Sequence, residues 1–202
     1  MFAGTLTFAE TFIMGQHRHF ILHKPFGYIS QFVTDAQKKK TLGELYPFPE
    51  GTMAIGRLDE DSEGLLLLTT DGMCSEIIRS KKVEKEYYAQ VDGLIAEEAL
   101  EKLKSGVEIG VRDVKYTTLP CKAYRLSDDP GFAPRTKKIR DERHGPTSWV
   151  SITLTEGKIR QVRKMTAAVG FPTLRLFRVR IGNIHLGNLM PGEVVEVNEL
   201  LV

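Results

Sequence analysis

A short acidic turn is the part of this chain whose residue types could best do chemistry. Residues 56–72 read GRLDEDSEGLLLLTTDG, and three carboxylates and an arginine stand within residues 57–61. The apolar run 65–68 follows and predicts a buried strand. Because loops presented by a rigid strand often carry active-site residues, this turn is the candidate site, with Asp59 among its acids.

From the residues alone, three interpretations of the turn stay open. Asp59, Asp61 and Glu63 alternate as in calcium loops, but Thr70 stands at the twelfth position, where such a loop needs Glu, so calcium is disfavoured. Paired carboxylates would also suit a glycoside hydrolase. A solvated acidic turn without chemistry is the third interpretation, and local evidence favours it.

Basic residues gather in the later part of the chain. Residues 134–180 contain twelve Lys and Arg and three Asp and Glu, a charge of +9, whereas the whole chain carries +2 and the remainder is therefore −7. This asymmetry indicates a surface for a polyanion. Solvated surface charge is the alternative, and charge alone weighs the two equally. A basic face counts against the hydrolase.

The elements that must position these residues are mixed in order. Strands are expected over 19–23, 65–68, 84–91, 149–154, 174–181 and 194–197, helices over 41–46, 73–79, 96–105 and 160–169, and a polar loop over 132–146. Thr41 and Glu44 have capping-box spacing, and Gly106 and Gly170 would end the last two helices. Without strict βαβ alternation, the predicted fold class is α+β.

Composition points to an ordered globular protein. The 202 residues, 42% of them apolar, suffice for one domain or two small lobes. No apolar run approaches the roughly 20 residues of a membrane span. Cys74 and Cys121 lack metal-ligand spacing and are expected as free, buried thiols. Residues 1–18 are expected to be a poorly ordered leader rather than a signal peptide.

Three ordered motifs resemble those of a known family, the RsuA-type RNA pseudouridine synthases. The matching segments are GRLD through LLLLTTDG at 56–72, KEY at 85–87 and EGKIRQVRKM at 156–165. RVRIGNI at 178–184 and LMPGE at 189–193 look like the family too, and the resemblance runs from residue 20 to about 200.

Within that family, the chain looks most similar to the RluE type, which acts on large-subunit ribosomal RNA. The segments that carry this are SQF at 30–32, TLP at 118–120, PTSW at 146–149 and GFPTLRL at 170–176. The resemblance implies a two-lobed catalytic domain over 19–202, a largely antiparallel sheet flanked by helices, and no S4 domain.

The resemblance also implies the reaction: a uridine base is detached from its sugar at N1 and rejoined at C5, without cofactor or metal. Asp59 is the implied catalytic residue, and it would attack C1′ or remove a C2′ proton. Arg163 is the implied bidentate partner, because a guanidinium favours the ionised carboxylate. Tyr87 is implied to stack on the flipped base and is a candidate acceptor of the C5 proton. Strand alternation turns Tyr88 to the opposite face.

The remaining expected contacts are with RNA. Arg57 is the candidate to fill the gap left by the flipped uridine, because its planar head can stack like a base; an ion pair with Glu60 or Asp61 is the alternative. Residues 135–143 are expected to form a basic arm that holds phosphates. The full expected RNA-binding set is Arg57, Lys85, Arg135, Lys137, Lys138, Arg140, Lys158, Arg160, Lys164 and Arg175.

The expected partner is ribosomal RNA of the large subunit. The protein is expected to be a cytoplasmic monomer that binds neither a membrane nor a small-molecule cofactor. A non-catalytic RNA-binding assembly factor on the same fold is the alternative function. The sequence does not indicate which uridine of the RNA is modified.

Overall fold

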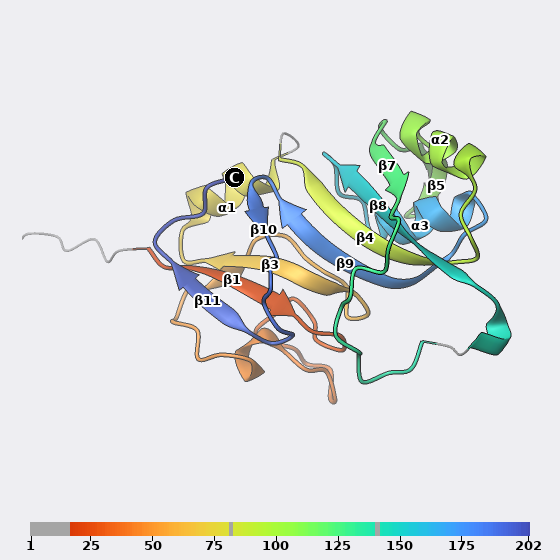
Figure 1. Cartoon of the computed structure of the whole chain (residues 1–202). Coiled ribbons are helices and arrows are strands. Elements are labelled where there is room, and N and C mark those ends of the chain that lie inside the picture. Colours follow the sequence, from red (N-terminus) through yellow and green to blue (C-terminus); the bar gives the residue numbers. More distant parts are fainter. Residues whose placement is uncertain (1–16, 81–82, 140–141) are drawn as a thin grey trace, which may run out of the picture.

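One long twisted sheet forms the centre of the molecule (Figure 1). The computed structural model describes residues 17–80, 83–139 and 142–202. The strand order is β11-β1-β3-β9-β4-β8-β7, with β10 paired to β9 and β2 to β3. The strands are β1 His19–Lys24, β2 Met53–Ala54, β3 Glu63–Thr69, β4 Lys85–Asp92, β7 Lys122–Arg125, β8 Thr147–Leu154, β9 Thr173–Ile181, β10 Ile184–His185 and β11 Val194–Val197.

Within the described residues, β3 and β9 are the one parallel pair of this sheet, and the other pairings are antiparallel. A separate hairpin joins β5 Glu108–Val111 to β6 Val114–Thr117. The predicted α+β class with a largely antiparallel sheet is confirmed.

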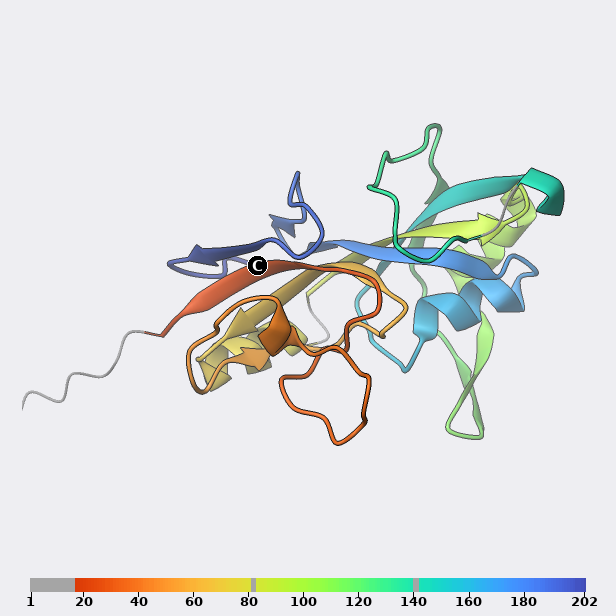
Figure 2. The same cartoon turned by 90° about the horizontal axis from the view of Figure 1, so that it is seen from below.

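The helices lie mainly on one side of the sheet. They are α1 Gly72–Arg79, α2 Glu97–Ser105 and α3 Gln161–Ala168, with two short 3₁₀ turns, η1 Leu42–Glu44 and η2 Glu142–His144. Figure 2 shows α1, the blue α3 and the green β5–β6 hairpin below the sheet, and the green-to-teal segment that follows β7 above it. No helix in the described ranges is long and apolar enough to cross a membrane.

The central strand β3 is buried on both faces, which explains its unbroken run of leucines. Leu65 and Leu67 belong to one apolar cluster, and Leu66 and Leu68 belong to another. This division follows the alternation of side chains along a strand. A third cluster fills the half of the molecule that holds α2, α3, β4 and β8.

Most predicted elements are confirmed to within two residues, but the two-residue strands β2 and β10 were not predicted, and the following regions also differ. The predicted helix over 41–46 is a single 3₁₀ turn, because Pro47 and Pro49 prevent it from continuing, although the capping box of Thr41 and Glu44 is present. Strands β5, β6 and β7 were not predicted, since four residues are too few for apolar alternation to give a clear signal. The predicted loop over 132–146 contains the turn η2. Both cysteines are free but half-buried rather than buried.

Gly64 fixes the start of β3 against β9. Its φ is +101°, and a Cβ placed there would lie 2.4 Å from the Arg178 carbonyl oxygen, which is backbone that cannot move aside. We expect Gly64→Ala to lower the free energy of unfolding by more than about 1 kcal/mol. Denaturant unfolding measures it, with Gly72→Ala as the matched control, because a Cβ on Gly72 meets nothing within 4 Å. Equal stability of the two variants would contradict the expected strain.

Candidate active site

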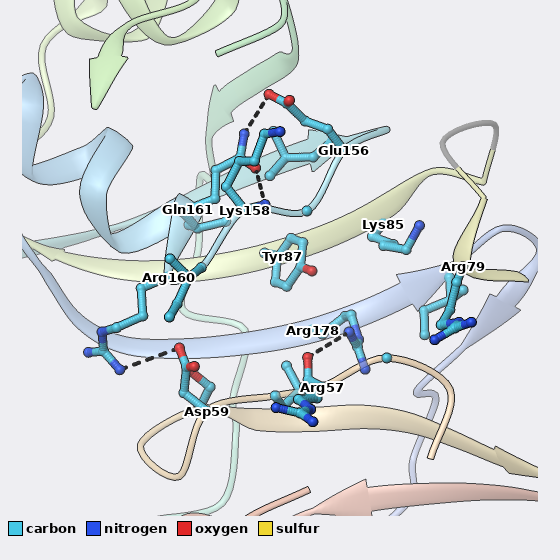
Figure 3. A pocket seen from close by; sticks show the side chains of 18 of the residues that line it. Arg57, Asp59, Arg79, Lys85, Tyr87, Glu156, Lys158, Arg160, Gln161 and Arg178 are labelled. Carbon is cyan, nitrogen blue, oxygen red and sulfur yellow. Dashed lines mark hydrogen bonds and ion pairs between the residues drawn. The ribbon is translucent and has the colours of Figure 1, made fainter. Parts of the chain in front are cut away.

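A cavity of about 530 Å³ opens where the acidic turn meets β4, β9, the start of α3 and the tip of the β5–β6 hairpin. Its charged walls are mostly cationic (Figure 3). The cations are Arg57, Arg79, Lys85, Arg112, Lys158, Arg160 and Arg178, and the acids are Asp59 and Glu156. Such a cavity favours an anionic ligand.

Asp59 faces this cavity from a turn that buried hydrogen bonds hold in place. The Ser30 hydroxyl donates to the Leu58 carbonyl oxygen at 2.8 Å, and its oxygen accepts from the Leu58 amide at 2.9 Å. The Ser62 amide donates to the Asp59 carbonyl oxygen at 3.0 Å. The Asp59 side chain is 34% exposed, so it is fixed yet reachable.

Among the described residues, Arg160 is the arginine that forms an ion pair with the Asp59 carboxylate. Its Nη1 lies 3.4 Å from Asp59 Oδ2, and its two Nη atoms donate to the Asp61 carboxylate at 3.0 and 2.9 Å. Burial alone would raise the pKa of Asp61, but the hydrogen bonds and charge of Arg160, with the charge of Arg163, hold that pKa below its usual range. Arg160 adopts a left-handed conformation, φ +53°, just before α3, which sets the direction of its side chain.

The predicted bidentate pair of Arg163 with Asp59 is wrong. Arg163 lies one turn further into α3, and its Nη2 donates to the Asp61 carbonyl oxygen at 2.8 Å and to Ser62 Oγ at 3.3 Å. Its guanidinium is 3.5 Å from the Asp61 carboxylate. Arg163 therefore holds the backbone of the turn, and the contact with the Asp59 carboxylate comes from Arg160.

Tyr87 stands inside the cavity between two groups of charged side chains (Figure 3). Asp59 and Arg160 lie on one side of its ring, and Lys85 and Arg178 lie on the other. Tyr88 packs on the opposite face of the sheet, with its ring centroid 6.2 Å from that of Phe132. The predicted placement of the two tyrosines on opposite faces is confirmed, and Tyr87 is the one that lines the cavity.

The expected RNA-binding side chains divide into two groups. Arg57, Lys85, Lys158 and Arg160 line the cavity. The rest lie outside the lining: Lys164 donates to the Gly110 carbonyl oxygen, Arg135 lies over the Phe26 ring, Lys137 and Lys138 lie on the segment after β7, and Arg140 lies outside the described residues.

Arg175 was predicted to bind RNA, but the structure shows its side chain buried inside the fold. Its side chain is 7% exposed and forms a bidentate ion pair with Glu63, at 2.8 and 2.9 Å. It also donates to the Ala133 carbonyl oxygen at 2.7 Å. Strand β9 places Arg175 within the sheet beside Glu63, the first residue of β3. The Arg175 charge therefore neutralises a buried carboxylate of the fold.

Sequence reasoning missed three cations around the site and counted a fourth, Arg178, only as part of the basic stretch 134–180. Arg79, Arg112 and Arg178 line the cavity, and Arg178 Nη2 is buried without a hydrogen-bond partner in the described chain. Lys24 is fully buried; its ammonium donates to the carbonyl oxygens of Pro25 and Tyr28, and burial lowers its pKa to about 8. Arg79 ends a predicted helix and Arg178 lies in a quoted motif, whereas no sequence pattern marked Arg112.

A family model supplies the observation that decides the assignment. The model for RNA pseudouridylate synthase matches residues 18–168, most of the chain. The chain belongs to this family. The pseudouridine synthase motifs quoted from the sequence therefore correspond to the acidic turn, β4 and the start of α3, which together surround the cavity.

Similar proteins agree with membership in the synthase family. The chain is 45% identical over 179 residues to ribosomal large subunit pseudouridine synthase E of Vibrio parahaemolyticus, covering 88% of this chain and 72% of that protein. It is 42% identical to the protein of that name from Xanthomonas axonopodis, covering 85% and 89%. A crystal structure of a pseudouridylate synthase, 29% identical, superposes with a TM-score of 0.71 over 90% of this chain and 70% of the other. The resemblance to the RluE type is confirmed.

Proposed function

We propose that this protein converts a uridine of large-subunit ribosomal RNA into pseudouridine, with Asp59 as the catalytic residue. One observation carries the proposal: a carboxylate and a phenol face the same cationic cavity, which is about 530 Å³ in volume. That size lies within the range of about 300–1,000 Å³ typical of small-molecule sites, so a single flipped nucleotide would fit. Relatives at 41–45% identity are named for action on the large ribosomal subunit.

The proposed reaction balances without a cofactor. The N1–C1′ bond of the uridine breaks, the uracil turns within the cavity, and C5 bonds to C1′; C5 then loses its proton and N1 gains one. Asp59 acts on the sugar, and an ionised carboxylate suits either attack on C1′ or removal of a C2′ proton. Arg160, 3.4 Å away, fixes the direction of that carboxylate, while Arg163 holds the turn.

Arg57 is proposed to occupy the place of the flipped base. The two acids that could have paired with it take other partners, since Glu60 pairs with Lys39 and Asp61 with Arg160. Arg57 lies exposed at the cavity wall, while its carbonyl oxygen accepts a hydrogen bond from Arg178 at 3.4 Å. Within the described residues, the Arg57 guanidinium has no hydrogen bond or ion pair, so it is free to stack on neighbouring bases.

All proposed reacting groups come from one chain, which supports a monomer as the active form. A ribosomal RNA substrate supports the cytoplasm as the proposed location of the reaction. Incubation of the purified protein with an unmodified large-subunit RNA transcript tests the proposal. Mapping of pseudouridines should find one modified site, whereas RNA bound without modification would favour a non-catalytic RNA-binding factor.

Tyr87→Phe separates stacking from proton transfer. The phenyl ring keeps the stacking surface, so RNA affinity should stay within about threefold, whereas loss of the hydroxyl should lower the single-turnover rate by about 100-fold or more. Binding and single-turnover assays on the same transcript measure the two effects. Tyr87→Leu should weaken both. A wild-type single-turnover rate for Tyr87→Phe would show that the Tyr87 hydroxyl has no part in the reaction.

Salt dependence reports on the cavity cations. Each phosphate contact that is lost should reduce the slope of log affinity against log salt concentration by about 0.7 for a single strand. Arg79→Ala and Arg112→Ala are expected to do so, because both side chains line the cavity. Lys102→Ala on the exposed side of α2 is the control and should leave the slope unchanged. Unchanged slopes for both arginine variants would place the RNA elsewhere.

A further inference from the structure

A carboxylate that the reaction does not use joins two walls of the cavity. Glu156 is 5% exposed and follows β8. Its Oε2 accepts from the Tyr116 hydroxyl at 2.5 Å, and its Oε1 accepts from the Leu119 amide at 2.8 Å and from Gln161 Nε2 at 2.7 Å. Tyr116 belongs to β6 and Gln161 begins α3, so one side chain ties the hairpin to the helix.

The hydrogen bonds to Glu156 are those of an ionised carboxylate. Burial alone would raise the pKa of Glu156, but donation by Tyr116, Leu119 and Gln161 outweighs burial and lowers that pKa. Charge-assisted hydrogen bonds of this kind are stronger than neutral ones. The junction is therefore firm at neutral pH.

On the helix side, the hydrogen bonds of Glu156 lead through Gln161 to the loop that carries Arg160, the residue that contacts Asp59. Gln161 Oε1 accepts from the Lys158 amide at 2.8 Å, which closes the loop over residues 158–161 (Figure 3). Arg160 lies inside that loop in its left-handed conformation. The position of the Arg160 guanidinium beside Asp59 thus depends on the loop that Glu156 and Gln161 hold.

On the hairpin side, Glu156 holds Tyr116 of β6, and the turn of the same hairpin contains Arg112. Arg112 and Asp113 form the turn between β5 and β6 with φ of +48° and +64°, a conformation that non-glycine residues adopt rarely. The Arg112 side chain lines the cavity. Lys164 of α3 donates to the Gly110 carbonyl oxygen at 2.7 Å, and Lys158 Nζ lies 4.4 Å from the Tyr116 ring centroid. The hairpin is therefore held to the α3 wall along its length.

We propose that Glu156 is a positioning residue that couples the β5–β6 hairpin to the loop of Arg160. Through this coupling, Arg112 is held where it can contact the RNA whose target nucleotide lies at Asp59. The inference rests on the proposed RNA function. Without the Glu156 junction, the hairpin would remain in the fold, but Arg112 would no longer be held over the cavity.

A double-mutant cycle on RNA binding tests the coupling. Arg112→Ala should weaken binding of the unmodified transcript about fivefold in the wild type and less than about twofold in Glu156→Gln, because interacting sites are not additive. Gln keeps the shape of Glu156 but lacks the charge and one acceptor. Tyr116→Phe removes a single hydrogen bond, offers a milder variant if Glu156→Gln folds poorly, and should reduce the effect of Arg112→Ala in the same way.

Lys115→Ala is the matched control for charge on the hairpin. Lys115 is 83% exposed, pairs with Glu108 and does not line the cavity, so its effect should be equal in both backgrounds. Additive effects of Arg112→Ala and Glu156→Gln would overturn the coupling and leave Glu156 with a role in stability alone.

Hydrogen exchange of the free protein gives a readout that needs no RNA. Glu156→Gln should speed exchange over residues 107–119 and 158–164 together, while α1 keeps its wild-type rates. Faster exchange in one segment only would overturn the coupling. If the wild type binds the transcript without modifying it, the proposed function fails but the coupling stands on the cycle. If the wild type does not bind, both fail.

Discussion

Asp59→Asn is expected to abolish pseudouridine formation while leaving RNA binding intact. The amide has the same shape and its oxygen can still face Arg160, but it can neither attack C1′ nor take a C2′ proton. Loss of a catalytic nucleophile or base should lower the single-turnover rate by at least about 1,000-fold. Affinity should be equal or slightly higher, because one negative charge leaves a cavity that holds phosphates. Both are measured on an unmodified large-subunit transcript.

The neighbouring acid provides the control for Asp59→Asn. Glu60 lies in the same turn but pairs with Lys39 and does not line the cavity. Glu60→Gln should retain nearly full activity. If Glu60→Gln were as inactive as Asp59→Asn, general disturbance of the turn would explain both, and the catalytic role of Asp59 would lose its support.

Arg175→Met is expected to have the largest effect on stability. Arg175 and Glu63 are 7% and 2% exposed, and their ion pair joins β9 to the first residue of β3. Removal of one partner leaves an uncompensated buried charge, which costs about 3–5 kcal/mol of the free energy of unfolding. For a domain of this size, that should lower Tm by roughly 6–20 °C. Thermal and denaturant unfolding measure it.

An exposed ion pair of the same geometry is the control for Arg175→Met. Arg18 forms a bidentate pair with Glu196, at 2.6 Å for each contact, but the two side chains are 44% and 40% exposed. Arg18→Met should change stability little, because exposed pairs are screened by water and salt. If Arg175→Met kept wild-type stability and weakened RNA binding instead, Arg175 would be an RNA contact after all.

Patterns that depend on one strand or helix were the ones the sequence could predict. Alternation placed Tyr87 and Tyr88 on opposite faces, and the leucine run 65–68 predicted a buried strand, which the structure shows to be buried on both faces. Ser30 was noted as part of a motif, and the structure gives it a physical role beneath Leu58. Local periodicity carries this information because it reflects contacts with the nearest elements.

Contacts between distant elements were not predictable in the same way. Charge alone made Arg175 look like an RNA contact, since nothing in the sequence indicates that β9 pairs with β3 and brings Glu63 beside it. The choice between Arg160 and Arg163 depended on a left-handed residue before α3. Arg112 lies in a hairpin without the Asn or Gly that usually marks such turns, so neither the hairpin nor its place at the cavity was foreseen.

Comparison of ribosomal RNA from cells with and without this protein tests the central claim most directly. Pseudouridines are mapped across the large-subunit RNA of both strains and of the deletion strain carrying either the wild-type gene or Asp59→Asn. We predict that a single large-subunit pseudouridine disappears in the deletion strain, returns with the wild type and stays absent with Asp59→Asn. An unchanged set of pseudouridines in the deletion strain, or recovery of the lost site by Asp59→Asn, would contradict the account.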